Sequence, residues 1–248
     1  EGWLAEKLAP YEGDRWMKRY RAIDLPVVRR LVTLRKEALH LRDTSKGASQ
    51  QRYEQVYTVV KRAIERMTLY KEELLKFLAD RELLKRHLTG VSDADLAALA
   101  AFQMSLQGEG ATERRPGPKV AFEDFALLLR LIQLKNGGFP DKAREDDVRL
   151  YDHLVVDEAQ DFGAVELQVL LSSIRSRTGV TIVGDVNQKI VLEADFIGWD
   201  ALIAELGVSG AKVARLEVAH RSTLPIMKIA DALVGDKTLD GRPGQKPR

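Results

Sequence analysis

The chain has 248 residues, with 39 Lys and Arg against 37 Asp and Glu, so its formal net charge is +2. A balance this close to neutral excludes a histone-like polycation, and any contact with nucleic acid has to use a local patch. The chain has no cysteine, which excludes disulfide scaffolds, thiol nucleophiles, thiolate zinc sites and iron–sulfur clusters. Its apolar runs are far shorter than the roughly 18 residues that span a bilayer, so we expect a soluble, cytoplasmic protein with no membrane partner.

The first part of the chain is predicted to be helical and basic. Residues 1–90 hold 20 Lys and Arg against 13 Asp and Glu. Between residues 53 and 88, apolar side chains recur at spacings of three, four and seven, which predicts one helix face. Ser92 is a predicted N-cap for a second helix that runs to about Gln107. Residues 108–119, rich in Gly, Pro and Arg, predict a linker.

The second part alternates between strand-like and helix-like stretches. A short helix over 122–134 comes first, and Asn136, Gly137 and Gly138 close it. Three β-like runs follow, each with a helix-like stretch after it: 150–156 before 165–175, 180–183 before 200–206, and 213–218 before 224–233. This alternation predicts an α/β fold with a parallel sheet covered by helices. Ligands of such sheets bind at the carboxyl ends of the strands.

Two adjacent carboxylates follow the first predicted strand. Asp157 and Glu158 come directly after an apolar run, with Gln160 close behind. A nucleotide hydrolase needs this arrangement, because one acid holds Mg²⁺ and the next orients or deprotonates the attacking water. A strand that simply ends in polar residues at the surface explains the pair equally well.

The ends of the next two strands favour the first interpretation. The second strand leads into Gly184 and Asp185, and Gln188 follows, whose amide can donate to a phosphate oxygen and accept from water. The glycine lets another part of the backbone pass closely. Arg221, predicted just past the tip of the third strand, can place its fork of donors on a phosphate, although such an arginine also suits a surface ion pair.

These stretches together resemble three motifs of the UvrD/Rep-like superfamily 1 helicases. The run from Asp157 to Gln160 resembles motif II, the run from Gly184 to Gln188 motif III, and 216–222 motif IV. The amino-acid sequences of 122–134 and of the run Val-Gly-Asp-Val-Asn-Gln most resemble the HelD-like branch of these helicases, which is associated with RNA polymerase. The resemblance covers 122–234.

The resemblance implies a role for each matching residue, with ATP and Mg²⁺ as cofactors. Asp157 would hold Mg²⁺ and Asp185 would support its shell, while Glu158 would activate water. Gln160 and Gln188 would sense the γ-phosphate, and Arg221 would act as an arginine finger.

The resemblance also implies a fold and a division into domains. The fold would be a partial RecA-like P-loop NTPase sheet with an inserted all-helical subdomain. Residues 1–107 would form that subdomain, of the 1B type, and 108–119 the linker. Residues 120–212 would be the C-terminal part of the first RecA-like domain, and 213–248 the start of the second.

No G-x-x-x-x-G-K-[ST] loop occurs in the 248 residues, so the chain carries no cradle of its own for the phosphates. Glu1 and the turn-rich C-terminal run lead us to expect a fragment. We expect this fragment to bind ATP weakly and to be inactive alone, although its parent would be an ATP-dependent DNA helicase.

Two functions of different class remain open. The first is a helicase or translocase whose partner is single-stranded or partly duplex DNA. The second is an ATPase that remodels RNA polymerase, with the helical part as its contact surface. Gln188 is followed by Lys189 and an aliphatic run instead of the aromatic run that stacks on DNA bases in many relatives, which weakens the first case. Basic pairs of the helical part can touch phosphates, but their interleaving with glutamates favours a solvated face.

Overall fold

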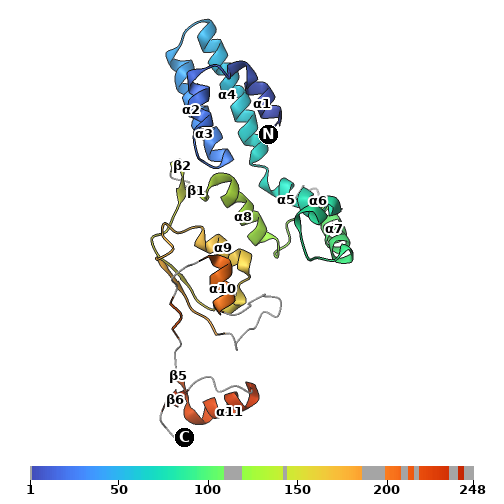
Figure 1. Cartoon of the computed structure of the whole chain (residues 1–248), viewed down its shortest axis with the longest axis vertical. Coiled ribbons are helices and arrows are strands. Elements are labelled where there is room, and N and C mark those ends of the chain that lie inside the picture. Colours follow the sequence, from blue (N-terminus) through green and yellow to red (C-terminus); the bar gives the residue numbers. More distant parts are fainter. Residues whose placement is uncertain are drawn as a thin grey trace. The chain divides into compact units, whose positions relative to one another are not determined.

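The structure is a computed structural model (Figure 1). It describes residues 2–108, 119–141, 144–185, 199–207, 212–214, 218–234 and 240–242. The chain divides into two compact units, one made of Glu1–Leu154 and Gln168–Gly179 and the other of Val155–Leu167 and Val180–Arg248. No helix among the described residues is both long enough and apolar enough to cross a membrane.

The first unit begins with helices that share one core. They are α1 (Gly2–Leu8), the 3₁₀ turn η1 (Ala9–Tyr11), α2 (Arg15–Arg21), α3 (Val27–Thr44) and α4 (Ala48–Met67). Helices α3 and α4 pack side by side as a hairpin, turned by Gly47 at a φ of 62° (Figure 1). Leu31, Leu34 and Val60 are at most 1% exposed in this core. Tyr53 and Tyr57 pack against it, in keeping with tyrosines that serve the core.

The prediction of one continuous helix face over 53–88 is wrong. The structure divides this stretch into α4, α5 (Tyr70–Leu78) and α6 (Arg81–His87). At the first break the hydroxyl of Thr68 donates to the carbonyls of Ile64 and Glu65. Asp80 is the N-cap of α6, since its carboxylate accepts from the N–H of Leu83. The apolar side chains on the two sides of the first break enter different cores.

The second core of this unit lies among α5, α6, α7 (Asp93–Gly108) and α8 (Phe125–Asn136). Ser92 caps α7 as predicted, since its hydroxyl oxygen accepts from the N–H of Asp95 at 3.2 Å. The helix expected at 122–134 is confirmed as α8, which begins and ends slightly later. Gly137 ends it in the left-handed region, at a φ of 77°. Most of the predicted linker, 109–118, lies outside the described residues, and the predicted domain bounds stay predictions.

The end of α8 is attached to the junction between α4 and α5. Lys135 Nζ donates to the carbonyl oxygen of Met67 at 3.1 Å and pairs with Glu73. Asn136 Nδ2 donates to the hydroxyl of Tyr70 at 2.6 Å. Burial raises the pKa of the Tyr70 phenol above its ordinary value, and the hydrogen bond from Asn136 opposes that shift. The junction therefore has a defined geometry despite the break in the helix.

We expect Lys135→Met to lower the free energy of unfolding by about 1 kcal/mol, because the Met67 carbonyl loses a charged donor. Lys7→Met is the matched control. Its exposed ion pair with Glu6 should contribute less than about 0.5 kcal/mol. Urea denaturation followed by helical circular dichroism measures both. Equal losses in the two variants would contradict the clamping role of Lys135.

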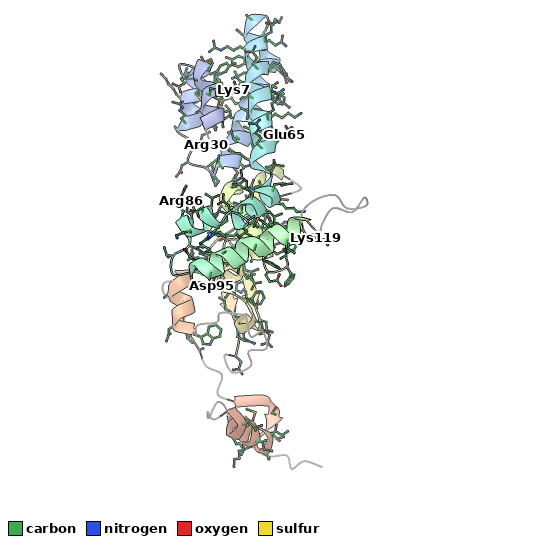
Figure 2. All side chains as sticks on the ribbon, turned by 90° about the vertical axis from the view of Figure 1, so that its right-hand side faces the viewer. Lys7, Arg30, Glu65, Arg86, Asp95 and Lys119 are labelled. Carbon is green, nitrogen blue, oxygen red and sulfur yellow. The ribbon has the colours of Figure 1, made fainter. Side chains whose placement is uncertain are left out.

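Side chains of both signs cover the helices of this unit. Figure 2 shows them as sticks, with Lys7 labelled on α1 and Glu65 on α4. Both of these side chains are exposed. Several basic residues of the unit have acidic partners: Arg42 pairs with Glu54, and Lys85 with Asp93. Such pairs fit a solvated face of mixed charge.

A β-hairpin that the sequence pattern did not predict follows α8. Strand β1 (Phe139–Asp141) pairs antiparallel with β2 (Arg144–Arg149). Gly138 makes this possible, since a Cβ at its position would lie 2.8 Å from the Cβ of Val148. The run of charges in β2 gave no apolar alternation and so no strand signal.

Two further strands, β3 (Leu154–Val156) and β4 (Val180–Ile182), pair with one another. The N–H of Leu154 donates to Gly179 O, and the N–H of Val183 donates to Val156 O. The partners advance together along both strands, which is the pattern of a parallel pair. Along the chain, the segment that connects the two strands contains the 3₁₀ turn η2 (Ala159–Asp161) and α9 (Ala164–Leu171). The predicted strands at 150–156 and 180–183 are confirmed in shorter form.

Helix α10 (Trp199–Leu206) agrees with its prediction, and so does α11 (Leu224–Val234). The third strand does not, because β5 spans Val218–Thr223 instead of 213–218. This strand pairs in parallel with β6 (Asp240–Arg242), with Val218, Ala219 and Thr223 in register and an irregularity between the last two. Arg221 therefore lies within a strand and not past its tip, which corrects the prediction.

Candidate active site

The carboxylates of Asp157 and Glu158 are both exposed at the carboxyl end of β3. Glu158 has a φ of 52°, and it is the one non-glycine residue with a positive φ in the part of the chain that the structure describes. The left-handed conformation costs a residue with a Cβ roughly 1–2 kcal/mol, so its surroundings must hold it there. One such interaction is local, since Asp157 Oδ1 accepts from the N–H of Glu158 at 2.9 Å.

Backbone hydrogen bonds join the acidic turn to the end of β4. The N–H of Val183 donates to Val156 O at 2.8 Å, and the N–H of Ala159 donates back to Val183 O at 2.9 Å. Ala159 is completely buried. The turn that carries the acids is thus fixed against the strand that leads to Asp185.

The side chain of Gln160 makes a second link between the two strand ends. This residue is only 1% exposed, and a buried amide needs a hydrogen-bond partner for each of its two polar atoms. Its Nε2 donates to Glu158 Oε2 at 2.8 Å, and its Oε1 accepts from the N–H of Asp185 at 2.9 Å. One buried amide therefore contacts both the acidic turn and the β4 end.

Gly184 leaves room for this amide. A Cβ at Gly184 would lie 2.6 Å from Gln160 Oε1 and 3.0 Å from the N atom of Ala159. The first distance is too short for a carbon atom and the second is tight, so a larger residue would displace the amide and press against the turn. The close approach expected of this glycine is confirmed.

Four of the six predicted site residues meet here, namely Asp157, Glu158, Gln160 and the half-buried Asp185. Gln188 lies outside the described residues. The backbone of Arg221 is described within β5, but its side chain is not. The structure thus assembles the acidic half of the predicted site.

The assembled residues fit Mg²⁺ in the form in which nucleotide hydrolases use it. Two exposed carboxylates supply the oxygen ligands that Mg²⁺ prefers. Among the described residues, no three acids or histidines converge to hold an ion by themselves. An ion here would take its other ligands from water and from the nucleotide's phosphates, as Mg²⁺ usually does. It would supply charge neutralisation on those phosphates.

Comparison with known proteins agrees with this fit. A family model described as an AAA domain matches residues 43–193, more than half of the chain, and its span includes β3, β4 and the acids between them. The chain belongs to the AAA domain family. Searches of curated proteins and of solved structures returned no match.

The AAA domain is a P-loop NTPase, which agrees with the mixed helix-and-strand architecture and with the parallel β3–β4 pair. The predicted fold class, a partial α/β P-loop NTPase, is confirmed. Nucleotide and Mg²⁺ use is the general property of such ATPases.

Sequence reasoning missed two features of this site. It identified Gln160 but not its burial, because motif order says nothing of which atoms an amide contacts. It also did not foresee the positive φ of Glu158. One signal was present, since a glycine directly before Asp185 indicates a close approach, but the sequence does not say what approaches.

Proposed function

We propose that this AAA domain supplies the acid-bearing part of the ATP site in a UvrD/Rep-like superfamily 1 helicase or translocase that acts on single-stranded or partly duplex DNA. One observation supports this most: the ends of two paired parallel strands bring Asp157 and Glu158 together with Asp185. In this proposal another segment supplies the phosphate-binding loop, because the given sequence contains no G-x-x-x-x-G-K-[ST] pattern.

The proposed chemistry follows from the position of each carboxylate. Asp157 would hold Mg²⁺ through water, with Asp185 supporting its shell. Glu158, exposed directly before the 3₁₀ turn η2, would orient the attacking water and accept its proton. Gln188 would sense the γ-phosphate, and the guanidinium of Arg221 would stabilise charge on the transferred group.

The second candidate is an ATPase of the HelD-like type that remodels RNA polymerase. The aliphatic run after Gln188 favours it, because this run lacks the aromatic side chains that stack on the bases of single-stranded DNA.

Stimulation by DNA separates the two candidates. The ATPase rate of a polypeptide that combines these residues with a phosphate-binding loop is measured with and without single-stranded DNA. At least tenfold stimulation supports the helicase. A rate indifferent to DNA, but changed by RNA polymerase, supports the remodeller.

The 248 residues alone should show no ATP turnover above background, because their sequence contains no G-x-x-x-x-G-K-[ST] loop to bind the phosphates. Phosphate release by the wild-type chain and by Glu158→Gln should therefore be equal. Turnover by the wild-type chain that disappears in Glu158→Gln would contradict this prediction.

A further inference from the structure

The amide of Gln160 is occupied at both ends by groups of the protein. Its nitrogen donates to Glu158 and its oxygen accepts from the N–H of Asp185. With 1% of the residue exposed, little of this side chain is accessible to a nucleotide. A γ-phosphate sensor needs an amide that faces the phosphate, and this one faces the protein.

We propose that Gln160 is a positioning residue, which holds the Glu158 carboxylate in place and ties it to the end of β4. This inference rests on the proposed function, because it assigns the orientation of the water-activating group to Gln160 and leaves phosphate sensing to other residues.

The conformation of Glu158 explains why such a residue is needed. Its left-handed backbone would relax to a commoner region if nothing restrained it. The hydrogen bond from Gln160 fixes one of its two carboxylate oxygens, so the other oxygen keeps a constant direction. A general base has to lie within hydrogen-bond reach of the water it activates, and a restrained carboxylate meets that condition.

The same amide couples the position of Glu158 to that of Asp185. A movement of the β4 end that displaces the Asp185 N–H would also displace Gln160 Oε1. Because the same amide is bonded to the Glu158 carboxylate, that carboxylate would move as well. Gly184 keeps this link short, since a Cβ there would approach Gln160 Oε1 to 2.6 Å. Metal support and water activation would thus share one mechanical connection.

The first test uses the 248-residue chain and needs no nucleotide. Amide hydrogen exchange gives the protection factor of the Asp185 N–H. Gln160→Met, which keeps the length of the side chain but removes both hydrogen bonds, should lower that protection about five- to tenfold. Gln133→Met is the matched control, because Gln133 is 3% exposed and its Nε2 donates to Val169 O instead. It should leave Asp185 unchanged.

An exchange of the two side chains makes the test specific for the pair. In Gln160→Glu, two carboxylates face each other, so repulsion should displace the side chain and lower the protection of Asp185 as far as Gln160→Met does. In the double variant Glu158→Gln with Gln160→Glu, a donor and an acceptor again face each other. Protection should return to within about threefold of the wild type. Unchanged protection in Gln160→Met, or no recovery in the double variant, would overturn the proposal.

The second test concerns catalysis, in the polypeptide that also has a phosphate-binding loop. Positioning predicts that Gln160→Met lowers kcat at least about tenfold, with the ratio of the Kd values for ADP and a non-hydrolysable ATP analogue within twofold of the wild type. A changed ratio would show that Gln160 senses the γ-phosphate and would overturn the proposal. If wild-type ATPase is absent while the exchange results hold, the proposed function fails and the link through Gln160 stands.

Discussion

Glu158→Gln should lower the kcat for ATP at least about 100-fold in a polypeptide that joins these residues to a phosphate-binding loop, because removal of a general base typically costs that much. The KM for ATP should stay within about threefold, since the carboxylate acts on water and not on the phosphate cradle. Steady-state phosphate release measures both constants. The geometry leads to this expectation: the side chain is exposed at the strand end while Gln160 restrains one of its oxygens.

Glu123→Gln is the matched control for this prediction. Glu123 is exposed, as Glu158 is, and its substitution by Gln also removes one negative charge. It lies before α8 and not in the acidic turn. The kcat of the Glu123→Gln variant should stay within twofold of the wild-type value. A Glu158→Gln variant with comparable turnover would remove Glu158 from the proposed mechanism.

Leu31→Ala should lower the free energy of unfolding of the first unit by about 2–5 kcal/mol, the range found for buried leucines. Leu31 is completely buried on α3, and its removal would leave a cavity in the core that α3 and α4 share. The midpoint of urea denaturation, followed by helical circular dichroism, reports the change.

Leu134→Ala provides the comparison on another helix. Leu134 is 60% exposed on α8, so the same truncation removes little buried surface. Its effect should be below about 0.5 kcal/mol. A loss for Leu31→Ala as small as that for Leu134→Ala would contradict the burial of Leu31 in the core that α3 and α4 share.

Local signals predicted the helices from α7 to α11 and two of the strands. The N-cap at Ser92 and the end of α8 at Gly137 depend only on a few neighbouring residues, so a local sequence pattern is sufficient to predict them. The breaks at Thr68 and Asp80 were missed, because the apolar spacing continues across them while the side chains enter different cores. Periodicity records which residues are buried, but not which core receives them.

The strand error at β5 has a comparable cause. Apolar content placed that strand over 213–218, whereas pairing with β6 places it over Val218–Thr223. Pairing partners far along the chain decide such limits, and a local pattern does not contain them. The consequence reaches the site, because Arg221 then belongs to a strand.

The candidate site was predicted by residue type but not by contact. The acids after β3 and Asp185 after β4 could be found because parallel strands end at one edge of their sheet. The double hydrogen bond of Gln160 could not be found, since it depends on the positive φ of Glu158 and on the space left by Gly184. Such atomic details follow from packing between segments that are distant in sequence.

Paramagnetic broadening by Mn²⁺ with ATP tests most directly whether the β3 and β4 ends form the metal–nucleotide site. Mn²⁺ prefers the same oxygen ligands as Mg²⁺ and reveals weak binding, so the isotope-labelled 248-residue chain is sufficient. We predict that the amide signals of Asp157, Glu158 and Asp185 broaden first, and that Asp157→Asn prevents it. If those signals persist while amides elsewhere broaden, or if Asp157→Asn broadens in the same way as the wild type, the strand ends are not the site.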